Sequence, residues 1–259
     1  MNDCRGLHTS SLLKNGKVLI AGGVVDDPEH GKNVKYIVNG AELFDPTTGD
    51  WTRTASLNQG RCIHTASVLL DGKVLVAGGG AGSALLDSAE LYDPSTGNWS
   101  IVDSMNWKRA FHTSTSLDNG KVLVTGDFGN ENDLLNSTEI YDPLTRKWKS
   151  TNSVSYRRYG HLATLLKNGK VLVIGGEDDD GYPVSSTELF DPSTETWTLK
   201  IWTNTNSMHY TRTWHTASVL ENGNALVVGG SDDGIGSYTA ELYNASINTY
   251  VHINDFRNV

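Results

Sequence analysis

Cysteine is scarce in this chain, with two residues among 259, so a disulfide framework is not expected to organise it. No apolar run reaches the length that crosses a bilayer, which argues against insertion into a membrane. The first residues, Met1–Arg5, contain no apolar signal-peptide core. We therefore expect no secretion and slightly favour the cytoplasm, although the sequence does not define the compartment.

Positive charge is also in short supply. The chain has 21 Lys and Arg residues against 30 Asp and Glu, a net charge of −9. Because binding to nucleic acid or to an anionic membrane surface requires a basic field, both classes of partner are disfavoured. The length allows a core large enough to be stable without metals or disulfides, and no cofactor is indicated.

What the sequence does contain is one unit repeated five times. Each unit has an arginine three residues before a histidine, a glycine 14 residues after it, then a glutamate, and an aromatic residue nine positions past that glutamate. The arginines are Arg5, Arg61, Arg109, Arg158 and Arg212, and the histidines are His8, His64, His112, His161 and His215. The glycines are Gly22, Gly23, Gly78, Gly79, Gly126, Gly175, Gly176, Gly229 and Gly230. The glutamates are Glu42, Glu90, Glu139, Glu188 and Glu241, and the aromatics are Trp51, Trp99, Trp148, Trp197 and Tyr250.

The first half of a unit predicts a β-hairpin. Small residues dominate residues 64–70, which suits a strand crowded by its neighbours. The Asp71-Gly72 pair is typical of a two-residue turn. The following residues 74–77 are apolar without alternation, so both faces of this strand are expected to be buried.

The second half completes a four-stranded sheet. The Gly78-Gly79 doublet permits a backbone conformation that a Cβ atom would block. A third strand over 89–92, a polar turn over 93–97 and a fourth strand from Trp99 follow. Since such a sheet cannot bury two apolar faces alone, we predict an all-β fold in which several sheets stack radially, a β-propeller.

The pattern R-x-x-H-T, N-G-K-V-L-V-x-G-G and S-A-E-L-Y-D-P-S-T-G-x-W resembles the kelch repeat of the galactose oxidase/kelch propeller superfamily. This resemblance implies one domain over residues 1–259, with four-stranded antiparallel blades at approximately 5–55, 61–103, 109–152, 158–201 and 212–254. We expect the five blades to close into a ring. An open arc, a piece of a longer array and a ring completed by a second chain are the alternatives.

The loops between second and third strands and between successive blades vary, and these loops are where we expect binding. The second-to-third loops are acidic, as in Glu177–Tyr182; solvated surface, a Ca²⁺ site and a contact for a basic partner are the possible interpretations. The loops between successive blades carry aromatic residues that either pack between loops or recognise a ligand. The predicted binding residues are the five repeated arginines together with Arg157, Tyr159, Trp202, Tyr210 and Trp214.

The repeated charged residues have competing interpretations. Each arginine either pairs with the repeated glutamate, caps carbonyls of the next blade, or faces an acidic peptide, as the kelch resemblance suggests. The repeated histidines favour structural hydrogen bonds over a metal site, because zinc needs three or four converging ligands. Cys4 and Cys62 are expected to be free thiols.

These features favour a non-catalytic module that binds an unidentified protein or peptide, with carbohydrate as an alternative ligand. The sequence contains no Ser-His-Asp arrangement, Walker loop or H-E-x-x-H motif. The resemblance also allows a copper-radical oxidase, although no motif surrounds Cys62. A glycosidase propeller is a further alternative, but no acid–base pair can be assigned to it.

Overall fold

The computed structural model describes residues 1–26, 35–129, 134–194, 202–204, 207–232, 235–236 and 239–253. The regular structure of these residues is β-strand, and none of them forms a helix that could cross a membrane. The chain divides into two compact units. Unit 1 comprises Met1–Ser116, Gly120–Val122 and Tyr141–Lys149; unit 2 comprises Leu117–Asn119, Leu123–Ile140 and Ser150–Val259.

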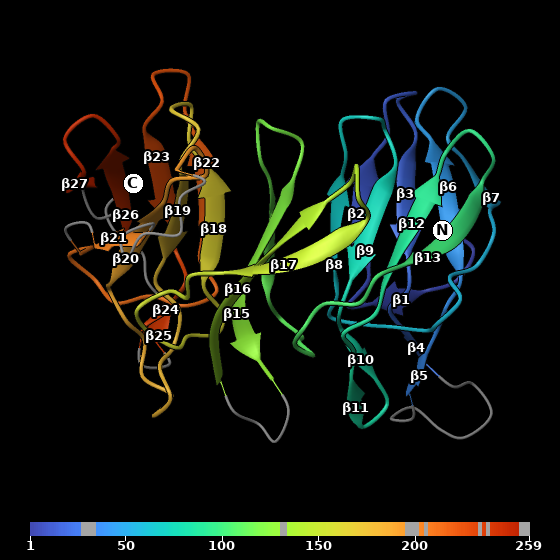
Figure 1. Ribbon diagram of the computed structural model, residues 1–259, viewed down its shortest axis with the longest axis horizontal. Helices are drawn as coiled ribbons and strands as arrows, with labels where there is room; N and C mark the ends of the chain where they lie inside the picture. The colour runs from blue at the N-terminus through green and yellow to red at the C-terminus, as the bar shows by residue number, and fades with distance from the viewer. Residues whose placement is uncertain are drawn as a thin grey trace. The chain divides into compact units, whose positions relative to one another are not determined.

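Five four-stranded sheets follow one another along the chain, each with its strands in sequence order (Figure 1). Sheet 1 contains β2 (Thr9–Leu12), β3 (Val18–Ala21), β6 (Ala41–Asp45) and β7 (Asp50–Arg53). Sheet 2 contains β8 (Thr65–Val68), β9 (Val74–Ala77), β12 (Ala89–Asp93) and β13 (Asn98–Val102). Sheet 3, whose residues both units share, contains β14 (Thr113–Ser116), β15 (Val122–Phe128), β16 (Leu134–Asp142) and β17 (Lys147–Thr151).

Sheets 4 and 5 belong to unit 2. Sheet 4 contains β18 (Leu162–Leu165), β19 (Val171–Ile174), β20 (Thr187–Phe190) and β21 (Trp202–Asn204). Sheet 5 contains β22 (Thr216–Val219), β23 (Ala225–Val228), β26 (Ala240–Asn244) and β27 (Thr249–Ile253). The predicted four-stranded antiparallel unit is thereby confirmed.

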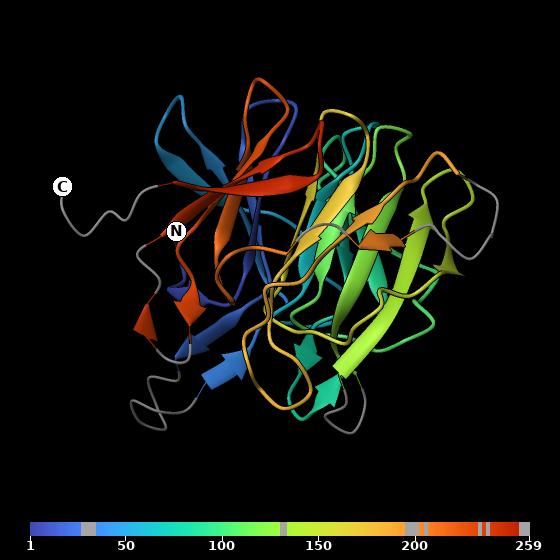
Figure 2. The ribbon, with the colours of Figure 1, turned by 90° about the vertical axis from the view of Figure 1, so that its left-hand side faces the viewer.

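Short strands occupy the second-to-third loops. They are β4 (Val24–Asp26) with β5 (Lys35–Ile37), β10 (Gly80–Ala81) with β11 (Ala84–Leu85), and β24 (Ser231–Asp232) with β25 (Ile235–Gly236). β1 (Arg5–Gly6), which precedes the first sheet, pairs with β4. Within unit 1, the β4–β5 and β10–β11 hairpins extend from the same end of their sheets (Figures 1 and 2). The variable loops of neighbouring sheets therefore gather at one end of that unit, as the sequence predicts.

The hairpin turns differ from the prediction by one residue. Leu69 donates its amide to the carbonyl of Lys73 at 2.8 Å, and Gly72 donates to Leu69 at 2.9 Å, so three residues lie between the bonded pair Leu69 and Lys73. Only Gly72 takes a positive φ (+87°) here, because Asp71 instead accepts the amide of Lys73 with its side chain. This is a type I turn closed by a glycine bulge rather than a two-residue primed turn.

The core lies between successive sheets. β9 and β19 are buried along their whole length, which confirms that second strands have two covered faces. In unit 1 the first strands β2 and β14 both contact β8, so the small residues do allow close approach. One apolar cluster joins sheets 1 and 2 through Leu13, Leu19, Ala21, Ala41, Leu57, Val74, Val76 and Tyr92.

The repeated aromatic of each fourth strand packs against an aromatic of the third strand. Trp99 lies opposite Tyr92 in the register, with ring centroids 5.0 Å apart. Its indole nitrogen donates to the carbonyl of Ala55 at 2.9 Å. Trp51, Trp148 and Tyr250 make the corresponding ring contacts with Phe44, Tyr141 and Tyr243. Trp197 lies outside the described residues.

All nine glycines of the predicted doublets have positive φ angles. At Gly78, φ is +63°, and an added Cβ would lie 2.5 Å from the carbonyl oxygen of Arg109 and 2.7 Å from the ring of His112. The glycine is therefore required by its own backbone conformation and by the close approach of the following repeat.

We expect Gly78→Ala to lower the free energy of unfolding by about 2–3 kcal/mol, because it adds a steric clash to the cost of a left-handed alanine. Gly16→Ala is the matched control, since Gly16 has a φ of +82° but nothing within 4 Å of the added Cβ. Urea denaturation of both variants separates the cost of the steric clash from the cost of a left-handed alanine. Equal losses of unfolding free energy in the two variants would show that the close approach of Arg109 and His112 contributes nothing.

Candidate binding surface

Arg61 is buried and fully engaged by its own sheet. One guanidinium nitrogen donates to the carbonyls of Gly78 and Ser88, both at 2.9 Å. The other donates to the hydroxyl of Ser88 at 3.1 Å and to the carboxylate of Glu90 at 3.0 Å. The guanidinium thus ties the glycine doublet to the third strand, two segments that diverge around the variable loop.

The same arrangement recurs in sheets 1, 4 and 5. The nitrogen–oxygen distances of the ion pairs are 2.8 Å for Arg5–Glu42, 3.1 Å for Arg158–Glu188 and 2.9 Å for Arg212–Glu241. In each case the arginine also donates to the carbonyl of the first doublet glycine, at 3.1, 3.0 and 2.9 Å respectively. Of the two structural interpretations, pairing with glutamate is therefore correct.

Two expectations about the arginines need correction. The carbonyls that they cap belong to their own sheet rather than to the next blade. Arg61, Arg109, Arg158 and Arg212 are 0% exposed and Arg5 is 9% exposed, so these guanidinium groups offer no surface to an acidic peptide. We remove all five from the candidate binding set.

The glutamates hold the chain segment that precedes each arginine. Glu90 accepts the backbone amides of Asn58 at 2.7 Å and Gln59 at 3.1 Å. Burial alone would raise the pKa of Glu42, but the amides of Asn2 and Asp3 and the charge of Arg5 outweigh it and hold that pKa below its usual value. The pKa of Glu241 is lowered in the same way, against burial, by His209, Tyr210 and Arg212.

Three of the repeated histidines, His64, His112 and His161, form hydrogen bonds to a threonine of the preceding sheet. The Nε2 atom of His64 lies 2.9 Å from the hydroxyl of Thr9, and that of His112 lies 2.8 Å from the hydroxyl of Thr65. Burial, reinforced by the positive charge of Arg61, lowers the pKa of His64 to about 3. This imidazole is neutral at pH 7 and acts as a structural bridge between sheets.

The residue before each repeated histidine has a left-handed backbone. The φ angles are +55° at Leu7, +56° at Ile63, +60° at Phe111, +63° at Gly160 and +55° at Trp214. Hydrogen bonds link these positions within each unit: Ile63 donates its amide to Leu7, Phe111 donates to Ile63, and Trp214 donates to Gly160, at 3.1–3.2 Å. We call these five residues the left-handed positions.

Three of the left-handed positions display apolar side chains to solvent. Leu7 and Trp214 are each 55% exposed and Phe111 is 38% exposed. Sequence reasoning did not single out Leu7 or Ile63. The available signal is that this position is apolar or glycine in all five repeats, but only the structure shows the conformation that they share.

Trp214 lies on an aromatic platform in unit 2. A Cβ on Gly160 would be 3.1 Å from the indole ring, so the glycine provides room for it. Tyr159 meets Trp214 edge-on, with centroids 6.1 Å apart, and packs against Phe128 at 5.0 Å. The hydroxyl of Tyr159 donates to the carboxylate of Glu177, which fixes the orientation of the tyrosine ring.

The other predicted binding residues divide into two groups. Arg157 is exposed, and Tyr210 is 40% exposed beside His252, with ring centroids 5.3 Å apart. Trp202 pairs through its backbone with Phe190, and its side chain lies outside the described residues. The structure therefore brings Tyr159 and Trp214 together and leaves Arg157 and Tyr210 as separate exposed side chains.

The acidic loop after β19 is a compact turn. Asp178 accepts the backbone amides of Asp180 at 3.1 Å and Tyr182 at 2.9 Å. Within the described part of the chain, no group of three or more His, Cys, Asp or Glu side chains is arranged to hold a metal ion. The acidic residues at 27–29, 131–133 and 233 lie outside the described residues.

The described cysteines are both free thiols. Cys4 is exposed, whereas Cys62 is buried with its sulfur 3.7 Å from the carbonyl oxygen of Gly80. Burial raises the pKa of the Cys62 thiol, so this side chain is held as a neutral group next to the backbone of β10.

Comparison with known proteins supports the fold and the repeat. The solved structure of YjhT has a TM-score of 0.75 to this chain at 17% sequence identity, covering 96% of this chain and 84% of that one. The Kelch motif family matches residues 61–106 and 158–199. A search of curated proteins found no match.

The four-stranded sheets and this structural likeness define an all-β protein of the β-propeller class. The two motif matches coincide with sheets 2 and 4, including the arginine that begins each repeat. The chain therefore contains kelch motifs at residues 61–106 and 158–199.

Proposed function

We propose that this chain is a non-catalytic module that binds a protein or peptide through the aromatic platform of unit 2, which Phe128, Tyr159 and Trp214 form. The observation that carries the proposal is the 55% exposure of Trp214 on left-handed backbone at this platform. Leu7 and Phe111 have the same backbone conformation within unit 1. Residues held in sparsely populated backbone conformations cluster at active sites, ligand clamps and switch regions.

The energetic argument rests on a comparison between repeats. A left-handed conformation costs a residue with a Cβ atom about 1–2 kcal/mol, whereas glycine adopts it freely. Gly160 shows that glycine suits this position. Four repeats nevertheless carry a bulky apolar residue there. For Leu7 and Trp214, each 55% exposed, burial offsets little of the cost.

The repeated polar residues support a binding role over catalysis. Four of the repeated arginines, with their glutamates, are engaged in contacts that hold the sheets. The pKa values of His64 and His215 are both lowered by burial to about 3. Such histidines are poor proton acceptors near neutral pH.

Trp214→Gly tests the proposal. Glycine keeps the left-handed backbone, so we expect a stable protein that loses its partner by at least about tenfold in affinity, as for a hot-spot tryptophan. The measurement is affinity capture from lysate of the source organism, with captured proteins identified by mass spectrometry and then titrated individually.

Ile247→Ser is the matched control, because Ile247 is 63% exposed in the β26–β27 turn at the other end of sheet 5. A partner held by the wild type and by this control, but lost by Trp214→Gly, supports the proposal. Equal capture by all three contradicts it. A glycan array probed in parallel tests the carbohydrate alternative, since Trp214 and Tyr210 are also suited to stacking on sugar rings.

A further inference from the structure

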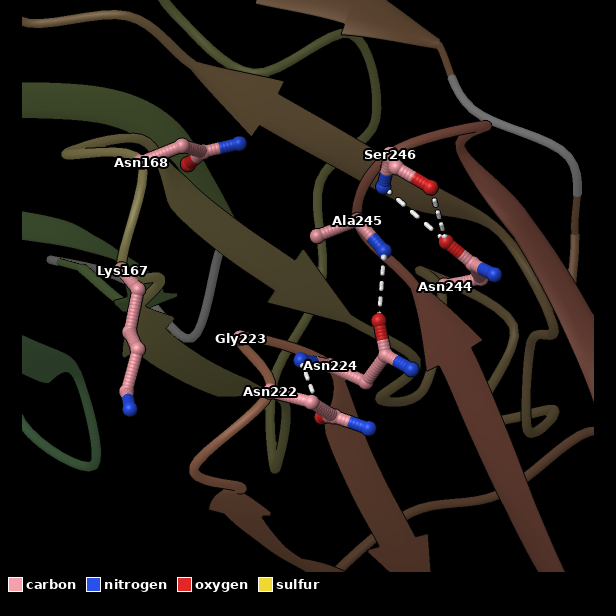
Figure 3. Close-up of a pocket in the computed structure, with 8 residues that line it drawn as sticks. All are labelled: Lys167, Asn168, Asn222, Gly223, Asn224, Asn244, Ala245 and Ser246. Carbon is pink, nitrogen blue, oxygen red and sulfur yellow. Dashed lines mark hydrogen bonds between the residues drawn. The ribbon is translucent and has the colours of Figure 1, made fainter.

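A second surface feature lies at the opposite end of unit 2 from Trp214. It is an open hollow of about 490 Å³ formed by the turns after β18, β22 and β26. Figure 3 shows the residues that line it: Lys167, Asn168, Asn222, Gly223, Asn224, Asn244, Ala245 and Ser246. Four carboxamides and one ammonium group line the hollow, and no carboxylate does.

The carboxamide oxygens are all occupied by the turns themselves. Asn168 and Asn222 each accept a backbone amide at 3.1 Å, two residues further along. Asn224 accepts the amide of Ala245 at 3.3 Å, and Asn244 accepts the amide and the hydroxyl of Ser246 at 3.0 and 2.7 Å. Because the oxygens are assigned by these bonds, the NH₂ groups are the atoms left to donate to a ligand.

Comparison with the other repeats shows that this chemistry is particular to sheet 5. At the equivalent positions, the other four sheets carry a lysine and an aspartate that form an ion pair. Their nitrogen–oxygen distances are 3.2 Å for Lys17–Asp45, 3.8 Å for Lys73–Asp93, 3.3 Å for Lys121–Asp142 and 3.4 Å for Lys170–Asp191. Asn224 and Asn244 replace both partners in sheet 5, which removes the carboxylate.

The corresponding hollow of unit 1 provides an internal contrast. It has a volume of about 190 Å³ and is lined by Lys14, Asn15, Asp71, Gly72 and Pro94. Asp71 carries its carboxylate where sheet 5 has Asn222. The same turn geometry is therefore acidic in one unit and donor-rich in the other.

We infer that the hollow of unit 2 binds an oxyanion, the carboxylate or phosphate group of a small ligand. The carboxamide NH₂ groups supply donors and Lys167 supplies the positive charge, while its ammonium group also donates to the carbonyl of Glu221. Nearby, Lys170 and Asp191 neutralise each other. This site is separate from the left-handed positions, so either proposal can fail alone.

The test is a titration with inorganic phosphate and, separately, with sodium acetate at low ionic strength, followed by NMR of the asparagine side-chain amides. We expect saturable shifts in the wild type and affinity about tenfold weaker in Asn244→Asp, because a carboxylate then faces the ligand. Saturation by phosphate alone assigns a phosphate site, and saturation by acetate as well assigns a carboxylate site.

Two further variants keep the result interpretable. Asn224→Lys with Asn244→Asp restores the ion pair of the other four sheets, so it should fold and also lose binding. Asn15→Asp adds the same charge to the hollow of unit 1 and should bind as the wild type does. The inference is overturned by an absence of saturable shifts with either anion, or by equal affinity in the wild type and Asn244→Asp.

Discussion

Replacing Arg61 by alanine is expected to lower the free energy of unfolding by about 3–5 kcal/mol, the usual cost of breaking a buried ion pair. The side chain is 0% exposed and makes four hydrogen bonds to Gly78, Ser88 and Glu90. Its removal leaves the buried carboxylate of Glu90 without its counter-charge and takes a donor from the carbonyls of Gly78 and Ser88, of which Ser88 keeps the backbone amide of Gly78. Both losses are expensive in a region that water does not reach.

The pair itself need not stabilise the fold relative to an apolar replacement. Burial lowers the pKa of Arg61, against the opposing effect of Glu90, which shows how strongly desolvation opposes the charge. The informative measurement is therefore a double-mutant cycle with Arg61→Ala and Glu90→Ala by urea denaturation. We expect a coupling free energy above about 1.5 kcal/mol for groups that share one network.

Lys170→Ala is the matched control for this cycle. Its ion pair with Asp191 has a similar distance, 3.4 Å, but the lysine side chain is 40% exposed. Surface pairs contribute about 0–1 kcal/mol, so this variant should unfold close to the wild type. A loss at Arg61→Ala no larger than the loss at Lys170→Ala would contradict the structural role assigned to the repeated arginine.

Acid is expected to lower the free energy of unfolding already at pH values above those at which most carboxylates take up protons. The pKa values of His64 and His215 are lowered from 6.5 to about 3 by burial, with the nearby arginines adding to the effect. Between these pKa values the unfolded chain binds protons that the folded chain does not. Stability therefore falls as the pH drops from about 6.5 towards 3, by roughly 2 kcal/mol per histidine at pH 5.

The repeated glutamates also make the protein less stable as the pH falls, but at lower pH values than the histidines do. Because the pKa values of Glu42 and Glu241 are lowered in the folded state, the stability that they contribute is lost as the pH falls through those values. Urea midpoints measured from pH 8 to pH 4 should be flat above about pH 7 and should decrease steadily below it.

His64→Gln separates the histidine contribution from the rest. Glutamine can still bond to the hydroxyl of Thr9, which lies 2.9 Å from the imidazole, but it cannot take up a proton. We expect a shallower decline of the urea midpoint between pH 6.5 and 5. An unchanged slope would mean that His64 is not the titrating group.

The repeat pattern accounts for most of the local structure. The structure contains the positive φ angle expected at Gly78 and the buried second strand expected over Val74–Ala77. It also contains the third and fourth strands expected from the spacing of Glu90 and Trp99. These features depend on neighbours within one hairpin or one sheet, where side-chain period and turn chemistry decide the outcome. The hairpin at Asp71-Gly72 was one residue longer because the aspartate side chain stabilises a type I turn.

Contacts between residues far apart in the sequence determine which residues of the candidate sites are buried and which are exposed. The spacing of Arg61 could not indicate whether it faces solvent or the interior, because its acceptors lie 17 and 27 residues further along the chain and converge only when the sheet forms. The left-handed backbone at Ile63 and Trp214 arises from bonds to the preceding repeat. The donor-rich hollow likewise exists because three turns, at 167–168, 222–224 and 244–246, meet in unit 2.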